Sequence, residues 1–145
     1  MDIKLIIIIF FVSGDGVFNW FDLSGNHIKD PGILKEIKEE YIPKNITKCV
    51  IPNSVTSIGI NAFSYYDILK EITIPNSVKR IGDYAFYSCT SLKEITIPDS
   101  VTHISNCAFY RCKSLKEITI PDSVTSIGYY VFAHCESLKE IVIHN

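Results

Sequence analysis

The sequence predicts a β-rich solenoid built from stacked repeats, and three observations support this fold class. The twelve residues SLKEITIPDSVT stand at 91–102 and return unchanged 23 positions later, at 114–125. Each unit of this length holds too few apolar residues to bury its own apolar face, so we expect the units to stack on one another. A partial unit precedes four full units that follow without a gap, and the five cover 46–53, 54–76, 77–99, 100–122 and 123–145.

Each unit contains a short strand with the pattern L-x-x-I-x-I. Alternation places the two Ile residues, which are two positions apart, on one face of a short strand. A proline follows and ends the strand, because proline has no N–H to donate to the ladder. Stacked units then set these strands in a parallel ladder with a spacing of about 4.8 Å. The leucines are Leu69, Leu92, Leu115 and Leu138.

After the proline each unit reads S-V-x-x-I-G and then A-F-x-x-C. The first pattern predicts a second extended segment that ends in a glycine turn. The second predicts one helical or 3₁₀ turn that closes the unit. Three cysteines share one position of this turn, and because Cys is small and usually buried we expect a ladder of core thiols at Cys89, Cys112 and Cys135.

Residues 1–45 precede the repeat and predict a small α+β cap over the first repeat. The apolar-rich runs 4–12 and 17–23 are joined by Ser-Gly-Asp-Gly, which predicts a hairpin. Residues 30–43 predict a helix that has Asp as its N-cap, Pro at its first position and Pro at its end. On one face of that helix lie Ile33, Leu34, Ile37 and Tyr41. A solenoid needs such a cap because the core of its first coil is otherwise exposed.

The apolar run Leu5–Val12 has three interpretations. It is too short to span a bilayer, and as a run rich in Ile it is typical of a buried β-strand. It is also compatible with the hydrophobic part of a signal peptide over residues 1–14, although Asp2 offsets Lys4 at its start. A membrane-associated segment is the third interpretation. The predicted location therefore stays open between the cell surface, secretion and the cytoplasm.

The full pattern L-x-x-I-x-I-P-x-S-V-x-x-I-G-x-x-A-F-x-x-C resembles the 23-residue leucine-rich repeat of the BspA type, also called the Treponema pallidum type. The resemblance covers residues 46–145, and the chain departs from it at Tyr66, Ser105, Val131 and His144. It implies a right-handed leucine-rich-repeat solenoid with a parallel sheet on one face. It also implies a non-enzymatic protein of the surface-recognition or adhesion kind, as found in bacteria, protozoa and large viruses.

Composition and motifs argue against several classes of function. The net charge of −2 and the interleaving of Lys with Glu lack the basic footprint of a nucleic-acid binder. None of the five cysteines forms a C-x-x-C pair, so we expect no metal and no cofactor. No Gly-rich loop, carboxylate pair or nucleophile motif indicates an enzyme or a small-molecule substrate. Asn45-Ile46-Thr47 is a formal N-glycosylation sequon.

Variation between units gathers around Ala-Phe, and seven of the eight tyrosines lie there. Tyr and Arg are enriched in the cores of protein interfaces. Tyr also fills half-exposed turn positions without any such role. The candidate protein-binding residues are Tyr65, Tyr66, Tyr84, Tyr87, Tyr110, Arg111, Tyr129 and Tyr130.

A second candidate surface is the outward face of the strands, where Lys-Glu pairs recur beside Thr. Stacking sets these residues in columns, which indicates either a recognition surface or a solvated sheet face with balanced charge. The columns comprise Lys70, Glu71, Lys93, Glu94, Lys116, Glu117, Lys139 and Glu140.

The sequence thus predicts a non-catalytic protein–protein interaction module, with surface recognition or adhesion as the form that the resemblance implies. The alternative is an intracellular scaffold or a self-associating repeat protein. The clue to the alternative is the strand at the C-terminal end of the repeats, whose open edge invites pairing with another chain.

Overall fold

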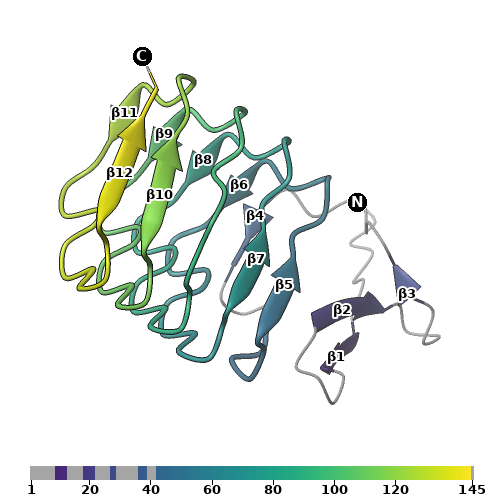
Figure 1. Ribbon diagram of the computed structural model, residues 1–145. Coiled ribbons are helices and arrows are strands. Elements are labelled where there is room, and N and C mark those ends of the chain that lie inside the picture. Colours follow the sequence, from purple (N-terminus) through teal and green to yellow (C-terminus); the bar gives the residue numbers. More distant parts are fainter. Residues whose placement is uncertain (1–8, 13–17, 22–26, 29–35, 39–41, 145) are drawn as a thin grey trace.

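The computed structural model describes residues 9–12, 18–21, 27–28, 36–38 and 42–144. From residue 36 onward the described chain winds into a solenoid of five coils (Figure 1). Each coil begins with a two-residue strand, and these strands pair in parallel in one sheet in chain order. We number the coils one to five by these strands, which are β4 (Glu36–Ile37), β6 (Ser57–Ile58), β8 (Arg80–Ile81), β9 (His103–Ile104) and β11 (Ser126–Ile127).

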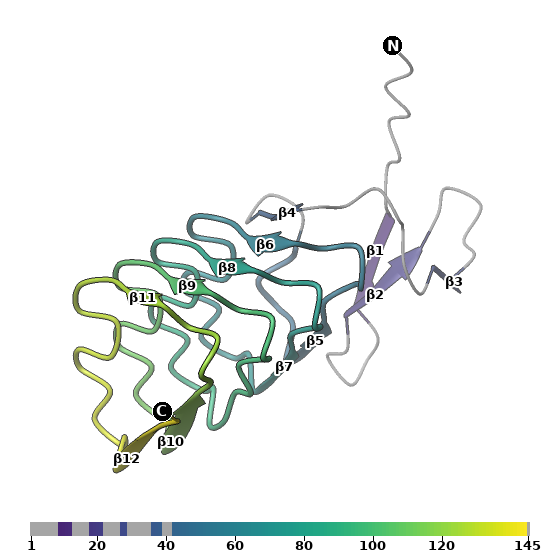
Figure 2. The same cartoon turned by 90° about the horizontal axis from the view of Figure 1, so that it is seen from above.

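The L-x-x-I-x-I segments form the opposite side of each coil (Figure 2). β5 (Lys48–Val50) pairs in parallel with β7 (Glu71–Thr73), and β10 (Glu117–Ile120) pairs in parallel with β12 (Glu140–Ile143). In both pairs each residue lies opposite the residue 23 positions later, which confirms the predicted register. The equivalent segment of the third coil, Glu94–Ile97, is not a strand.

The Ala-Phe segments close each coil without a helix. The N–H of Phe63 donates to the carbonyl of Ala85 in the next coil at 2.7 Å, and that of Phe86 donates to Ala108 at 2.8 Å. Two residues of each segment have φ between 54° and 62°; they are Asn61, Tyr65, Tyr84, Ser88, Cys107, Arg111, Tyr130 and His134.

The prediction of a helical or 3₁₀ turn is therefore wrong: among the described residues none lies in a helix. A helix directs every N–H back along its own chain. Here two left-handed residues four positions apart break the helical path, and every second N–H points to the next coil instead, as those of Asn61, Phe63 and Tyr65 do. The closing segments thus form a third hydrogen-bonded ladder along the solenoid.

The core is a set of columns, one for each apolar position of the repeat. Phe63, Phe86 and Phe109 are fully buried, and their rings stack with centroids 5.2 Å apart in each neighbouring pair. Leu69, Leu92 and the other repeated Leu, Ile and Val residues of coils two to four are buried in the same way. Each residue thus packs on its counterpart in the next coil, as the repetition predicts.

The predicted thiol ladder is confirmed in the described coils. Cys89 and Cys112 are fully buried, and Cys135 is half-buried in the last coil. The thiols of Cys89 and Cys112 donate to the carbonyls of Phe63 and Phe86 at 3.0 and 3.2 Å. The ladder therefore belongs to the core.

The N-terminal region contains a three-stranded antiparallel sheet of β1 (Ile9–Val12), β2 (Phe18–Phe21) and β3 (His27–Ile28). The pairing of β1 with β2 agrees with the two apolar runs, whose predicted connection lies outside the described residues. β2 lies beside β5 in the first coil (Figure 1). No helix long and apolar enough to cross a membrane occurs in the described part of the chain.

The predicted helix over 30–43 is wrong where the structure describes it. Glu36 and Ile37 form β4, which pairs in parallel with β6, and Ile37 is fully buried in the solenoid core. The rest of the predicted helix lies outside the described residues, apart from 38 and 42–43, which are not helical. Packing in the Ile column overrides the local helix pattern, so the first coil begins before residue 46.

Candidate functional site

Tyrosines project from the Ala-Phe segments of successive coils. Tyr65, Tyr84, Tyr129 and Tyr130 are exposed, with Tyr129 and Tyr130 at 77% and 73%, and Tyr87 and Tyr110 are half-buried. The left-handed backbone at three of these positions turns the side chains outward from the coil. We call the tyrosine surface the set Tyr65, Tyr84, Tyr87, Tyr110, Arg111, Tyr129 and Tyr130.

Rings of the tyrosine surface contact one another across coils. The ring of Tyr87 meets Tyr65 edge-on at 5.3 Å and lies parallel to Tyr110 at 5.0 Å. Tyr84 also contacts Tyr87 edge-on, at 5.7 Å. At the far end Tyr110 contacts the imidazole of His134 at 5.1 Å. Of the predicted candidates of coils two to four, four thus form one continuous array of rings: Tyr65, Tyr84, Tyr87 and Tyr110.

The environment of Tyr87 keeps its phenol protonated. Desolvation by its neighbours raises the pKa of Tyr87, and the phenols of Tyr65 and Tyr110 raise it further, while Arg111 opposes the rise. At the first coil, the Lys44 ammonium lies 6.0 Å from the ring centroid of Tyr65. Basic side chains therefore lie near two rings of the array, Lys44 near Tyr65 and Arg111 near Tyr87.

Tyr66 does not belong to the tyrosine surface. It is fully buried, and its phenol donates a hydrogen bond to the carbonyl of Ile42 in the first coil. It occupies the position that Cys89 and Cys112 hold in the next coils, so the repeat itself indicates a core residue here. Because its side chain is buried, Tyr66 is not available to a partner and is removed from the predicted binding residues.

His134 is an array member that the sequence candidates omit. It holds the position of Tyr65 and Arg111 in the last coil, with the same left-handed backbone. The signal that identifies it is this shared position rather than its residue type.

The Lys and Glu columns are exposed throughout, as predicted, but they do not share one face. Glu71, Glu94 and Glu117 line a groove of about 820 Å³ on the side of β7 and β10. None of the four column lysines lines it. Glu140 lies on β12 beyond the groove. The predicted single surface is therefore two regions: three glutamates line the groove, and the four lysines and Glu140 lie outside it.

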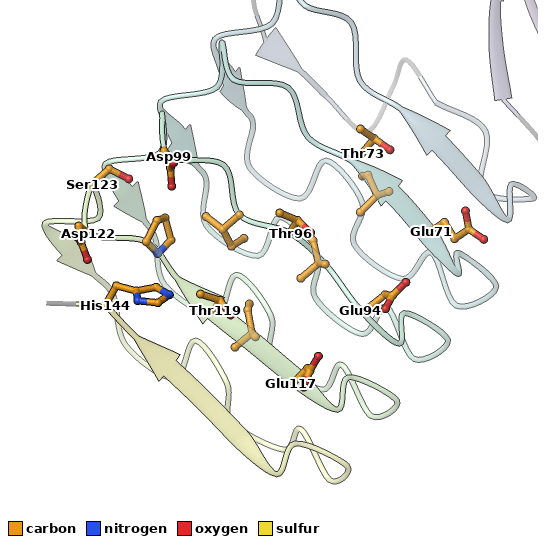
Figure 3. Close-up of a pocket in the computed structure, with 15 residues that line it drawn as sticks. Glu71, Thr73, Glu94, Thr96, Asp99, Glu117, Thr119, Asp122, Ser123 and His144 are labelled. Carbon is orange, nitrogen blue, oxygen red and sulfur yellow. The ribbon is translucent and has the colours of Figure 1, made fainter.

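The groove crosses coils two to five (Figure 3). We call it the acidic groove. Glutamates lie at one end of each strand segment, threonines at its middle, and Asp99 and Asp122 beyond the prolines. Its polar lining residues are Glu71, Thr73, Glu94, Thr96, Asp99, Glu117, Thr119, Asp122, Ser123 and His144.

The described coils contain buried cysteines but no cluster of metal-ligating side chains. No group of three or more His, Cys, Asp or Glu side chains suited to a metal ion occurs among the described residues. Burial raises the pKa of the Cys49 thiol to about 12, and it raises the pKa of Cys89 and Cys112 as well. These thiols stay protonated near neutral pH and are poor nucleophiles.

Comparisons with solved structures agree on the fold. The leucine-rich repeat protein TpLRR of T. pallidum is 25% identical, with a TM-score of 0.72, over 92% of this chain and 67% of its own. A leucine rich cell surface protein of Faecalibacterium prausnitzii is 28% identical, with a TM-score of 0.62, over 88% of this chain and 38% of its own. A leucine-rich repeat protein of Bacteroides ovatus is 30% identical, with a TM-score of 0.65, over 98% and 41%.

The chain therefore spans two thirds of the first of these proteins and about two fifths of the other two. No curated protein matches the chain. Repeats of this kind generally mediate protein–protein interaction and are typically non-catalytic. The family model described as the BspA type leucine rich repeat region matches residues 35–145 in six copies, which includes β4 and starts earlier than the resemblance at 46. The chain belongs to the BspA-type leucine-rich repeat family.

Proposed function

We propose that the protein binds a partner protein through the tyrosine surface, as a surface-recognition or adhesion module. The observation that carries the proposal is the continuous ring array from Tyr65 through Tyr87 and Tyr110 to His134. It combines a large apolar contact area with phenol groups that hydrogen-bond at its tip.

The backbone that carries the array is hydrogen-bonded from coil to coil, which favours binding. The backbone beneath it is held by hydrogen bonds between coils, such as that from the Tyr65 N–H to the Tyr87 carbonyl at 2.7 Å. A partner therefore has no loop to order in this segment when it binds, which lowers one part of the entropic cost of association. The name of the F. prausnitzii relative, a cell surface protein, agrees with recognition outside the cell.

The test compares partner recovery by the intact protein and by two triple variants. The first variant carries Tyr87→Ala, Tyr110→Ala and Tyr130→Ala. The second carries Lys70→Ala, Lys93→Ala and Lys116→Ala, which removes exposed side chains outside both the array and the acidic groove. The baits are presented to immobilised extracellular-matrix proteins and to a lysate, and bound proteins are quantified by mass spectrometry.

We expect at least one protein to be recovered by the intact chain and by the lysine variant, and to be lost with the tyrosine variant. Equal recovery by all three baits, or no specific recovery by the intact chain, would contradict the proposal.

Self-association is a second candidate, favoured by the apolar side chains of the fifth coil. Ile127, Ile141 and Ile143 are 46%, 42% and 61% exposed, whereas their counterparts one coil earlier, such as Ile104 and Ile118, are buried. Pairing of β12 with a second copy would cover Ile141 and Ile143, and contact of the same copy with β11 would cover Ile127. Sedimentation velocity at high micromolar concentration tests it, and a purely monomeric protein rules it out.

We also propose that the three-stranded sheet of β1, β2 and β3 covers the first coil as a cap. The position of β2 beside β5 supports this role.

A further inference from the structure

The first coil departs from the later coils at two positions, and together they create an acceptor for an N-linked glycan. In the four full units the residue before the repeated Leu is Ser or Ile, and the residue after it is Lys. Asn45 and Thr47 hold these two positions beside Ile46 in the first coil. Asn45-Ile46-Thr47 is therefore the one Asn-x-Ser/Thr sequence of the chain, and the repeat itself creates none.

Asn45 lies in an exposed turn of the first coil, directly before the fully buried Ile46. In the third coil the equivalent Ser91 donates a hydrogen bond back to the carbonyl of Asp67 in the coil before it, at 2.5 Å. Asn45 makes no hydrogen bond to any residue that the structure describes. Its amide is therefore free to carry a bulky group outside the fold, as a glycosylated Asn requires.

Thr47, the second part of the acceptor, is held by the next coil. It is half-buried, and its carbonyl accepts the N–H of Lys70 at 2.8 Å and that of Glu71 at 3.2 Å. A glycosyl transferase has to bind the Asn and the Thr of an acceptor together. Attachment of the glycan therefore precedes the docking of the second coil on the first, and the exposed turn then accommodates the glycan in the folded chain.

The residue opposite Asn45 in the second coil is an exposed isoleucine. β5 and β7 pair with each residue opposite the one 23 positions later, and this register continued backward sets Asn45 beside Ile68. Ile68 is 43% exposed, whereas the same position is Ser in the three later coils. The apolar face of a sugar ring on Asn45 would remove part of the Ile68 side chain from water, which is favourable.

We propose that Asn45 is an N-glycosylation site and that the first sugar of its glycan packs on Ile68. The donor is an oligosaccharide linked to a lipid diphosphate. The Asn45 amide nitrogen forms a bond to the anomeric carbon of the first sugar, and the bond from that carbon to the diphosphate oxygen breaks. The lipid diphosphate leaves with the bonding electrons, and one amide proton passes to a base of the transferase. The inference rests on the proposed recognition outside the cell, because this chemistry belongs to the secretory pathway.

The experiment measures the intact mass of the protein isolated from its natural source, before and after treatment with a peptide N-glycosidase, and peptide mapping locates the modified residue. The same measurement is made on the full chain secreted from eukaryotic cells. Asn45→Ser and Thr47→Lys remove the acceptor and install the residues that later coils carry at these positions, so both variants suit the fold. Thr47→Ser keeps the acceptor. Circular dichroism confirms that the variants fold.

We expect a glycan on Asn45 in the natural protein, in the secreted chain and in Thr47→Ser, and none in Asn45→Ser or Thr47→Lys. We also expect the glycosylated chain to unfold at a higher urea concentration than the same chain made in bacteria without the glycan. That difference should shrink in Ile68→Ser, which removes the apolar side chain that the first sugar covers.

An unmodified Asn45 in the natural protein would overturn the site, and so would a glycan on the Thr47→Lys variant. Equal urea midpoints with and without the glycan, or an unchanged difference in Ile68→Ser, would overturn the contact with Ile68. The partner recovery described above uses the chain without a glycan. An unmodified Asn45 with normal partner recovery therefore overturns this inference alone, and a glycan on Asn45 without partner recovery contradicts the tyrosine surface alone.

Discussion

The phenol rings of Tyr87 and Tyr110 stack in neighbouring coils, with centroids 5.0 Å apart and planes 5° from parallel. The two residues hold the same position of the repeat, so the stacking of coils places one ring over the other. The core phenylalanines beside them stack at 5.2 Å in the same manner. The surface array is therefore an outward continuation of the geometry that the core imposes.

Substitution of Tyr110 by Phe should lower the pKa of Tyr87. The neighbouring phenols of Tyr65 and Tyr110 raise that pKa, since ionisation of one disfavours ionisation of the next. An ultraviolet titration of phenolate absorbance measures the change, with Tyr87 assigned by its own Phe variant. Tyr129→Phe is the control because that ring makes no contact with Tyr87 among the described contacts. An unchanged titration in Tyr110→Phe would contradict the coupling.

Truncation of a ring in the middle of the phenylalanine column should be far more costly than truncation at its end. Phe86 is fully buried between Phe63 and Phe109, so Phe86→Ala should lower the free energy of unfolding by about 3–5 kcal/mol. Phe132 is only partly buried and has its nearest stacked ring at 5.8 Å. Phe132→Ala should lose less in urea-induced unfolding, and equal losses would disprove column packing.

Glycine at a left-handed position should stabilise the chain. Arg111 has φ of 58°, which is unfavourable for a residue with a side chain. Arg111→Gly should raise the free energy of unfolding by about 0.5–1 kcal/mol. Lys113, two residues later, lacks a positive φ, so Lys113→Gly should instead lower it by about 0.5–1 kcal/mol. Thermal unfolding followed by circular dichroism distinguishes the two, and a loss in both variants would refute the backbone argument.

Stability should fall as the pH rises above about 9. The unfolded chain loses its thiol protons near the ordinary pKa, whereas burial keeps the thiols of Cys49, Cys89 and Cys112 protonated in the folded chain. The folded state then holds more protons, so each thiol lowers the free energy of unfolding by up to about 1.4 kcal/mol per pH unit. Urea unfolding between neutral and alkaline pH measures the slope.

The control for the pH effect is Cys89→Ala, which changes stability at every pH and should also make the alkaline slope shallower. Tyr and Lys titrate in the same range in both proteins, so the difference between the slopes isolates the thiol. Identical slopes would mean that the thiol ionises equally in both states.

The repeat made the solenoid, the strand register and the core columns predictable, because each depends on apolar positions that recur every 23 residues. β4 could not be found from the repeat because it departs from the 23-residue period. Glu36 lies opposite Ser57, which is only 21 positions later. Ile37 also fits a helical pattern locally, and only its packing against the second coil decides its conformation.

The surfaces were predictable in position but not in organisation. The positions that vary between units identified Tyr87 and Tyr110. The ring contacts, however, depend on the positive φ of residues such as Tyr65 and Tyr84, and only a glycine at such a position would have indicated a positive φ in the sequence. The Lys-Glu pairs suggested a balanced face, since sequence spacing does not show that Lys93 lies outside the groove and Glu94 inside it. The absence of a strand at Glu94–Ile97 has no sequence signal, because the same letters form β10 one coil later.

The identity of 91–102 with 114–125 has a consequence at the level of the gene. An unequal exchange between these two segments deletes residues 91–113 and rejoins the chain at the same letters. Phe86 then meets Phe132, and Cys89 meets Cys135, so every core column closes again. Tyr87 loses Tyr110 and faces Ala133 instead. A lineage carrying this repeat can therefore shorten or lengthen its aromatic array by one step of recombination, while the folding of the remaining coils is inherited intact.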